Sequence, residues 1–138
     1  MLKYIVIFFL FSFIGWLYEY TIFNKKKPDG ITKKLFNINL PILPIYGFGG
    51  IILLLIHDYF EGYPIFIKII FATIILNIME CIAGLLSYKF YGYQTWNYNN
   101  KLIPICNGYI SLGSAFVWMI ATYSFFTIFD KIKLIQKK

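Results

Sequence analysis

The sequence of 138 residues has little charge and no arginine. Charged residues make up 14% of it and hydrophobic residues 59%, whereas an ordinary soluble domain has about 25% charged residues. Such a composition excludes an ordinary soluble enzyme and indicates a chain solvated by lipid. The net charge of +7 comes from lysines between apolar runs, where lysine anchors membrane helices, so we expect the lipid bilayer and no nucleic acid as partner.

Histidine and cysteine are also scarce, with one and two residues respectively. Cys81 lies inside an apolar segment and Cys106 lies beside a predicted helix start, so we expect both to pack rather than to form a disulfide. His57 is expected to be an interfacial residue without a functional role. No spacing of His and Cys fits a metal motif, so the sequence predicts no metal and no cofactor.

Three motifs are missing from the sequence. No G-x-x-x-x-G-K-[ST] phosphate loop occurs, so any ATP hydrolysis requires a separate ATPase subunit. No Ser/His/Asp grouping occurs, and we expect that the protein is not an enzyme. The first apolar run has no small-x-small cleavage site, which favours a retained membrane helix over a signal peptide.

Four apolar segments approach the length of about 20 residues that crosses a bilayer. We predict helices at residues 4–23, 40–59, 65–88 and 109–129. The predicted fold is all-α, a polytopic membrane helical bundle of about four transmembrane helices that forms one domain over residues 1–138. Prolines and glycines crowd the first half of the second segment, which is therefore either a spanning helix or a broken, re-entrant one.

Membrane orientation stays open at this stage. Five lysines follow the first segment and four end the chain. Three intervening spans would place these two groups on opposite faces, so the excess of positive charge expected on the cytoplasmic side does not decide between them.

Two carboxylates, Glu19 and Glu80, lie among the apolar residues of the predicted helices, whereas Asp58 lies at the very end of its helix. Glu80 is midway along the third helix, where a charge costs about 2.5–3.5 kcal/mol, so we expect it to face the bundle interior, either protonated or paired. Glu19 is near the end of the first helix and reaches either the headgroups or the interior. Paired intramembrane carboxylates could in principle serve as acid and base, but no other residue indicates a catalytic site.

Small and polar residues recur at helical spacing, which places them on one face of each helix. On the third helix they are Thr73, Asn77, Glu80, Gly84 and Ser87. Shorter stripes are Ser12, Gly15 and Glu19 on the first helix, and Asn107, Ser111, Ser114, Trp118 and Thr122 on the fourth. Two interpretations are open: the stripes either pack helices closely or line a path for a solute or for protons.

Several sequence stretches carry a resemblance to a known family. They are Phe13–Glu19, Leu43–Gly49, Glu80, Trp96–Asn99 and Asn107–Leu112. In their order and spacing, from about residue 8 to residue 119, the chain resembles the putative ABC-transporter type IV family of bacterial membrane proteins. The resemblance implies a multi-pass protein of the bacterial cytoplasmic membrane, often labelled a putative ABC transporter permease.

The family's recurrent residues fall mostly at positions that we predict to lie near one membrane face. The predicted polar pocket consists of Glu19, Tyr46, Glu80, Trp96, Asn97, Tyr98 and Asn107. Gly15, Pro44, Gly47, Gly49 and Gly108 are predicted to have structural roles. Asn97 departs from the family, whose members commonly have Asp at this position, which puts cation binding by that residue in doubt.

Two functions fit these features. The first is a permease-like subunit that moves a small solute or ion and uses Glu80, with or without Glu19, to hold a proton or cation. The second is a non-transporting membrane scaffold or regulatory subunit that binds another membrane protein. Partners are expected to be further copies of the chain, another membrane subunit or a separate ATPase.

Overall fold

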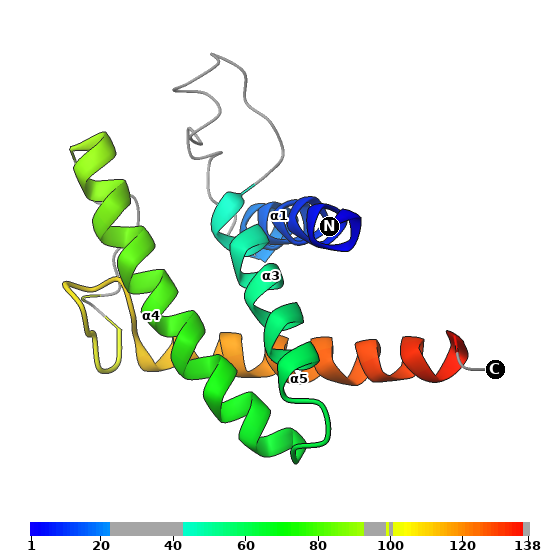
Figure 1. The fold of residues 1–138 in the computed structure, drawn as a ribbon. Coiled ribbons are helices and arrows are strands. Elements are labelled where there is room, and N and C mark those ends of the chain that lie inside the picture. The colour runs from blue at the N-terminus through cyan, green and yellow to red at the C-terminus, as the bar shows by residue number, and fades with distance from the viewer. Residues whose placement is uncertain (23–42, 93–98, 100, 137–138) are drawn as a thin grey trace. The chain divides into compact units, whose positions relative to one another are not determined.

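The computed structural model describes residues 1–22, 43–92, 99 and 101–136. These residues form four helices and no strand (Figure 1). The helices are α1 (Leu2–Ile22), α3 (Pro44–Tyr59), α4 (Ile65–Tyr91) and α5 (Leu112–Gln136). The predicted all-α class is therefore confirmed for the described part of the chain.

Helix α5 departs most from its predicted bounds. It begins at Leu112 rather than at 109, because the preceding residues form a turn in which the Tyr109 amide donates to the Cys106 carbonyl. It continues beyond 129 to Gln136. Charged residues end the apolar stretch at Asp130, but they have adequate helix propensity and so do not end the helix.

Helix α4 ends at a glycine. Gly92 has a φ of 80°, in the left-handed region, and its amide donates to the Tyr88 carbonyl at 2.7 Å. Glycine occupies this conformation at low cost, which explains the sharp end of the helix. The turn between α3 and α4 likewise contains Gly62 with a φ of 91°.

Helices α4 and α5 are long and apolar enough to cross a membrane, whereas Leu2–Tyr18 and Pro44–Tyr59 form shorter apolar helices. The 16 residues of α3 extend about 24 Å, less than the hydrocarbon core. Within Pro44–Tyr59 the helix is continuous despite its glycines, and residues 40–42 lie outside the described part. A bundle of four spans therefore stays a prediction.

The chain divides into two compact units, Met1–Leu54 and Leu55–Lys138. The first contains α1 and most of α3, and the second contains the end of α3 together with α4 and α5. The single domain predicted over residues 1–138 stays a prediction.

Helix α4 has an apolar exposed face and a polar buried face. Ile70, Ile74, Ile78 and Leu86 are more than half exposed, whereas Glu80 is only 7% exposed. A helix in water shows the opposite arrangement. The exposed isoleucines thus form a surface suited to lipid, and the polar stripe faces protein, as the residue spacing predicted.

Candidate functional site

The polar stripe of α4 is directed toward the rest of its unit. Glu80 and Gly84 are buried, and Thr73, Asn77 and Ser87 are half-buried. The Asn77 side-chain amide donates to the Thr73 carbonyl at 2.7 Å, within the helix. The Thr73 hydroxyl and the Asn77 amide oxygen are buried and make no hydrogen bond with the described residues. Two buried oxygen atoms thus lie before Glu80 on α4, that of Asn77 about one turn and that of Thr73 about two turns away.

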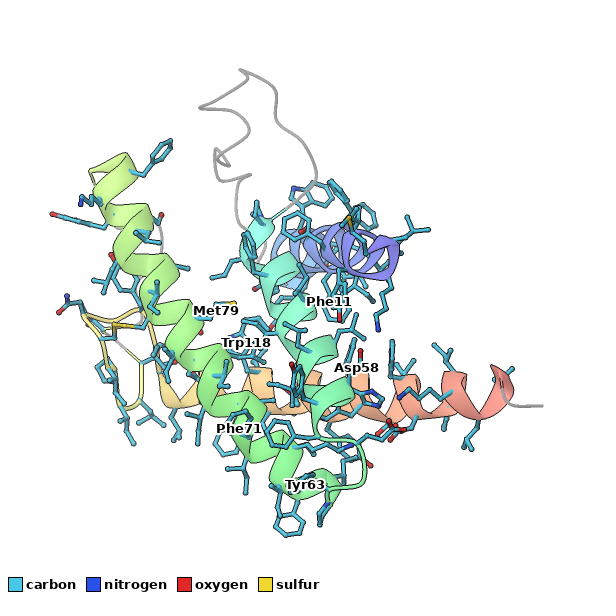
Figure 2. All side chains as sticks on the ribbon, viewed as in Figure 1. Phe11, Asp58, Tyr63, Phe71, Met79 and Trp118 are labelled. Carbon is cyan, nitrogen blue, oxygen red and sulfur yellow. A yellow bond between two sulfur atoms is a disulfide. The ribbon has the colours of Figure 1, made fainter. Side chains whose placement is uncertain are left out.

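The Glu80 carboxylate lies at the contact between α4 and α5. The Trp118 indole N–H donates a hydrogen bond of 2.9 Å to Glu80 Oε2, and the bond is buried. Figure 2 shows the Trp118 side chain rising from α5 toward α4. The indole N–H is a donor only, so it is suited to a carboxylate in a place that excludes water. The expectation that Glu80 faces the interior is confirmed.

Thr122 continues this contact along α5. Its side chain is fully buried, and its hydroxyl donates to the Trp118 carbonyl at 2.7 Å. A threonine that bonds to the carbonyl four residues earlier needs no partner from another helix. Thr122 is therefore a small residue whose hydroxyl is already hydrogen-bonded within its own helix. Its small size permits close packing beside Trp118.

The turn before α5 packs against α4 through Tyr109. This tyrosine is 1% exposed, and its ring lies so close to Gly84 that a Cβ atom on Gly84 would overlap it. Gly84 is thus required by the close approach of an aromatic ring. The spacing of small residues on α4 predicted such a contact without predicting its partner.

A disulfide joins Cys81 on α4 to Cys106 in the same turn, with the two Cα atoms 6.0 Å apart. The expectation that these cysteines only pack was wrong. Their separation of 25 residues carries no spacing signal, and the bond becomes evident only because the chain folds the turn back along α4. The disulfide attaches Cys106 to the residue that directly follows Glu80 on α4.

The start of α5 is stabilised by two serines. The Ser114 amide donates to the Ser111 hydroxyl at 3.2 Å, and the Ser111 amide donates to the Ser114 hydroxyl at 2.9 Å. This reciprocal pair is a capping box with serine in place of glutamate, and it satisfies two backbone donors at the helix start. Both serines belong to the stripe predicted on the fourth helix.

Asn107 lies at an open hollow that residues of this turn line together with residues of α4. The hollow has a volume of about 490 Å³ and is lined by Leu85, Tyr88, Asn107 and Tyr109. Asn107 is exposed and has a φ of 56°, and Gly108 after it has a φ of 86°. Asparagine and glycine are the residues that tolerate this conformation best.

A second polar contact joins the end of α3 to α5. His57 is 2% exposed, and its Nε2 atom lies 2.7 Å from Asp130 Oδ1. The imidazole also contacts the rings of Phe126 and Phe129. The sequence predicts no role for His57 and no contact with Asp130, because the two residues are 73 positions apart and neither belongs to a polar stripe.

In the first unit, α1 and α3 approach each other at glycines. A Cβ atom on Gly47 would overlap the Ser12 hydroxyl and lie 2.7 Å from the Phe8 carbonyl oxygen. A Cβ atom on Gly15 would overlap the Tyr46 ring. Small residues at such contacts let membrane helices pack backbone against backbone.

The predicted pocket residues fall into three groups. Glu80 and Asn107 belong to the second unit, linked through the Cys81–Cys106 disulfide and the turn. Tyr46 belongs to the first unit, together with Pro44, which begins α3, and the buried Gly49. The Glu19 side chain and residues 96–98, which contain Trp96, Asn97 and Tyr98, lie outside the described part.

The described residues contain no cluster of three or more His, Cys, Asp or Glu side chains that could hold a metal ion. The oxygen atoms along α4 come instead from a hydroxyl, an amide and one carboxylate. Such a set suits water, a proton or a hard cation of low charge rather than a transition metal.

Comparison with known proteins gives the family. Searches of curated proteins and of solved structures found no match to the chain. The sequence matches the family described as Putative ABC-transporter type IV over residues 6–137. With its two helices long enough to cross a bilayer, the chain is a membrane protein and belongs to the putative ABC-transporter type IV family.

Proposed function

We propose that this protein is a permease-like subunit of the cell membrane that moves a small cation, a proton or a cationic solute, with Glu80 as the charged group of the path. It has no catalytic role in this proposal. ATP hydrolysis, if the transport uses it, belongs to a separate subunit, because the sequence has no phosphate-binding loop.

One observation carries the proposal. The stripe on α4 combines a buried carboxylate with the buried oxygens of Thr73 and Asn77, which have no hydrogen-bond partner among the described residues. Buried polar groups in a membrane are costly, and groups that serve only packing are usually paired. A row of oxygens at intervals of one helical turn is instead suited to successive contacts with an ion or with water.

A second candidate function is a non-transporting membrane scaffold that binds another membrane protein. The Glu80–Trp118 hydrogen bond favours it, because a carboxylate held by an indole contributes to helix packing without any ligand. The two functions make opposite predictions for the effect of removing the charge of Glu80.

The test is ion flux in proteoliposomes that contain the purified protein. Protons, Na⁺, K⁺ and choline are supplied outside, and uptake is followed with a pH-sensitive dye and with radioactive tracers. We expect uptake of at least one of these cations, and we expect Glu80→Gln to reduce it at least tenfold while leaving the amount of folded protein unchanged.

The matched control is Glu61→Gln, which makes the same chemical change at a carboxylate whose side chain is 69% exposed. It should transport like the unmodified protein. Equal flux in Glu80→Gln and the unmodified protein would contradict the proposal. A Glu80→Gln protein that is more stable and shows the same absence of flux as its parent would favour the scaffold.

A further inference from the structure

The disulfide connects the Glu80 position to the turn before α5. Cys81 follows Glu80 directly on α4, and Cys106 belongs to the turn. In Figure 1 the yellow segment before α5 lies beside α4, as the bond requires. A covalent bond therefore fixes the turn to the helix that carries the buried carboxylate.

The backbone conformation of the turn requires support from the surrounding structure. Cys106 and Asn107 both have a φ of 56°, a conformation that residues with a side chain adopt rarely. Such residues persist where the surrounding structure determines them. Here the Tyr109 amide donates to the Cys106 carbonyl at 3.1 Å, and the disulfide attaches Cys106 itself to α4.

This turn also sets the position of α5. Tyr109 fills the space beside Gly84, and Ser111 begins the cap of α5. Trp118, two turns further along, donates to Glu80. Because the turn and the helix are continuous, a shift of the turn along α4 displaces Trp118 relative to Glu80.

Two independent observations indicate the side of the membrane that the connection before α5 faces. Disulfides persist in oxidising compartments and are rare in the cytosol. Helices α4 and α5 are consecutive candidate spans, so their connection and the C-terminal tail lie on opposite faces. The connection over residues 92–111 has one lysine, Lys101, and the tail after Asp130 has four, which favours a cytoplasmic tail. The five lysines after the first segment lie on the same face as the tail if α3, whose 16 residues are shorter than the hydrocarbon core, does not span.

We propose that Cys81–Cys106 is a redox site reached from the membrane side away from the cytoplasm, and that its disulfide holds the turn in the position that joins Trp118 to Glu80. The reacting partner is a dithiol protein of the thiol–disulfide oxidoreductase class. Its thiolate attacks one sulfur and breaks the S–S bond, and its second thiol then resolves the mixed disulfide. The two cysteines gain two electrons and two protons, and the partner becomes a disulfide; the reverse reaction oxidises the pair.

The inference rests on the proposed function only in giving Glu80 a role that the redox site controls. Its test measures no transport, so the two proposals can fail separately. The chain has two cysteines, and thiol labelling therefore reports on this pair alone.

The first experiment determines the face and the redox state. Intact cells that express the protein are treated with a membrane-impermeant phosphine reductant and then with an impermeant maleimide polymer, and the protein is separated by size. We expect two added polymers after reduction from outside and none without reduction. Free thiols in untreated cells, or labelling that requires permeabilised cells, would overturn the proposal. Cys81→Ser/Cys106→Ser is the control and should never be labelled.

The second experiment measures the effect of disulfide reduction on the Glu80 carboxyl group and on Trp118. The chain has three tryptophans, so Trp16→Phe/Trp96→Phe leaves Trp118 as the only source of indole fluorescence. In lipid vesicles we expect reduction to shift the Trp118 emission and the infrared band of the Glu80 carboxyl, with Glu80→Gln to assign that band. The Cys81→Ser/Cys106→Ser protein should resemble the reduced form and ignore the reductant.

An unchanged emission and an unchanged carboxyl band on reduction would show that the disulfide does not control Glu80 and would overturn the coupling. If the tryptophan variant does not fold, the infrared measurement on the unmodified sequence decides the question alone, because it needs no substitution except the assignment control.

Discussion

Two of the described helix contacts, α1 with α3 and α4 with α5, are made by different kinds of interaction. Helices α1 and α3 meet at Gly15 and Gly47, where the absence of side chains lets the backbones approach. Helices α4 and α5 meet through the Glu80–Trp118 hydrogen bond and are joined further by a disulfide to the turn before α5. The first contact depends on shape, and the second depends on specific polar atoms and on a covalent bond.

The difference has a consequence for what each contact can do. A contact that depends only on close packing has one arrangement, because protein interiors are densely packed and leave no room for a second one. A contact made of a carboxylate, a donor and a thiol pair has chemical states that differ in protonation and oxidation. Of these two contacts, the α4–α5 contact is therefore the one that can respond to an ion, to a change of pH or to a reductant.

The largest effect is expected from filling the glycine contact. Gly47→Ala places a methyl group against the Ser12 hydroxyl and the Phe8 carbonyl, and overpacking of this kind should lower the free energy of unfolding by about 1–3 kcal/mol. Unfolding in mixed micelles measures it. The matched control is Gly113→Ala in α5, where the nearest atom is the Ser111 hydroxyl at 3.8 Å.

Gly113→Ala should leave stability unchanged or raise it by up to about 1 kcal/mol, because alanine favours helix. Adding Ser12→Ala to Gly47→Ala should restore part of the loss, since the hydroxyl is removed while the Phe8 carbonyl remains. Equal stabilities of the two glycine variants would show that α1 and α3 do not touch at Gly47.

An intermediate effect is expected at the polar contact. Trp118→Phe removes the indole donor and leaves the Glu80 carboxyl without this hydrogen bond. A double-mutant cycle of unfolding free energies with Trp118→Phe, Glu80→Gln and the double variant should give a coupling energy of about 0.6–1.7 kcal/mol. This is the range found for hydrogen bonds between membrane helices. Additive single effects would mean that the two side chains do not interact.

The smallest effect is expected at the His57–Asp130 contact. Asp130 is 51% exposed at its side chain, so solvent competes for the bond, and Asp130→Ala should cost about 0.5–1.5 kcal/mol. Asp130→Asn keeps an oxygen acceptor for His57 and should cost less. Thermal unfolding of both proteins in the same detergent provides the comparison, and a larger loss for Asn than for Ala would contradict the assigned role of the oxygen.

Sequence reasoning predicted the parts of the fold that depend on local periodicity. The positions of the four helices and the buried face of α4 follow from the spacing of apolar and polar residues, because one helix face must suit lipid and the other protein. The burial of Glu80 was predicted for the same reason. Its partner Trp118 was on a predicted stripe, but no local signal joins two helices in register.

Contacts between residues far apart in the chain were not predictable. The Cys81–Cys106 bond and the His57–Asp130 contact depend on how two segments lie in space, and neither has a sequence spacing with physical meaning. The continuation of α5 to Gln136 was missed for another reason: the lysines after Asp130 mark the end of the apolar stretch and not of the helix.

The continuous helix α5 has a mechanical consequence. Trp118 and Asp130 lie on the same rod, separated by about 18 Å along its axis at 1.5 Å per residue, and each holds a contact with a different helix. A rigid rod does not rotate at one end alone. Any rotation of α5 that opens the Glu80 contact therefore also displaces the Asp130 carboxylate beside His57, so the two contacts are mechanically linked.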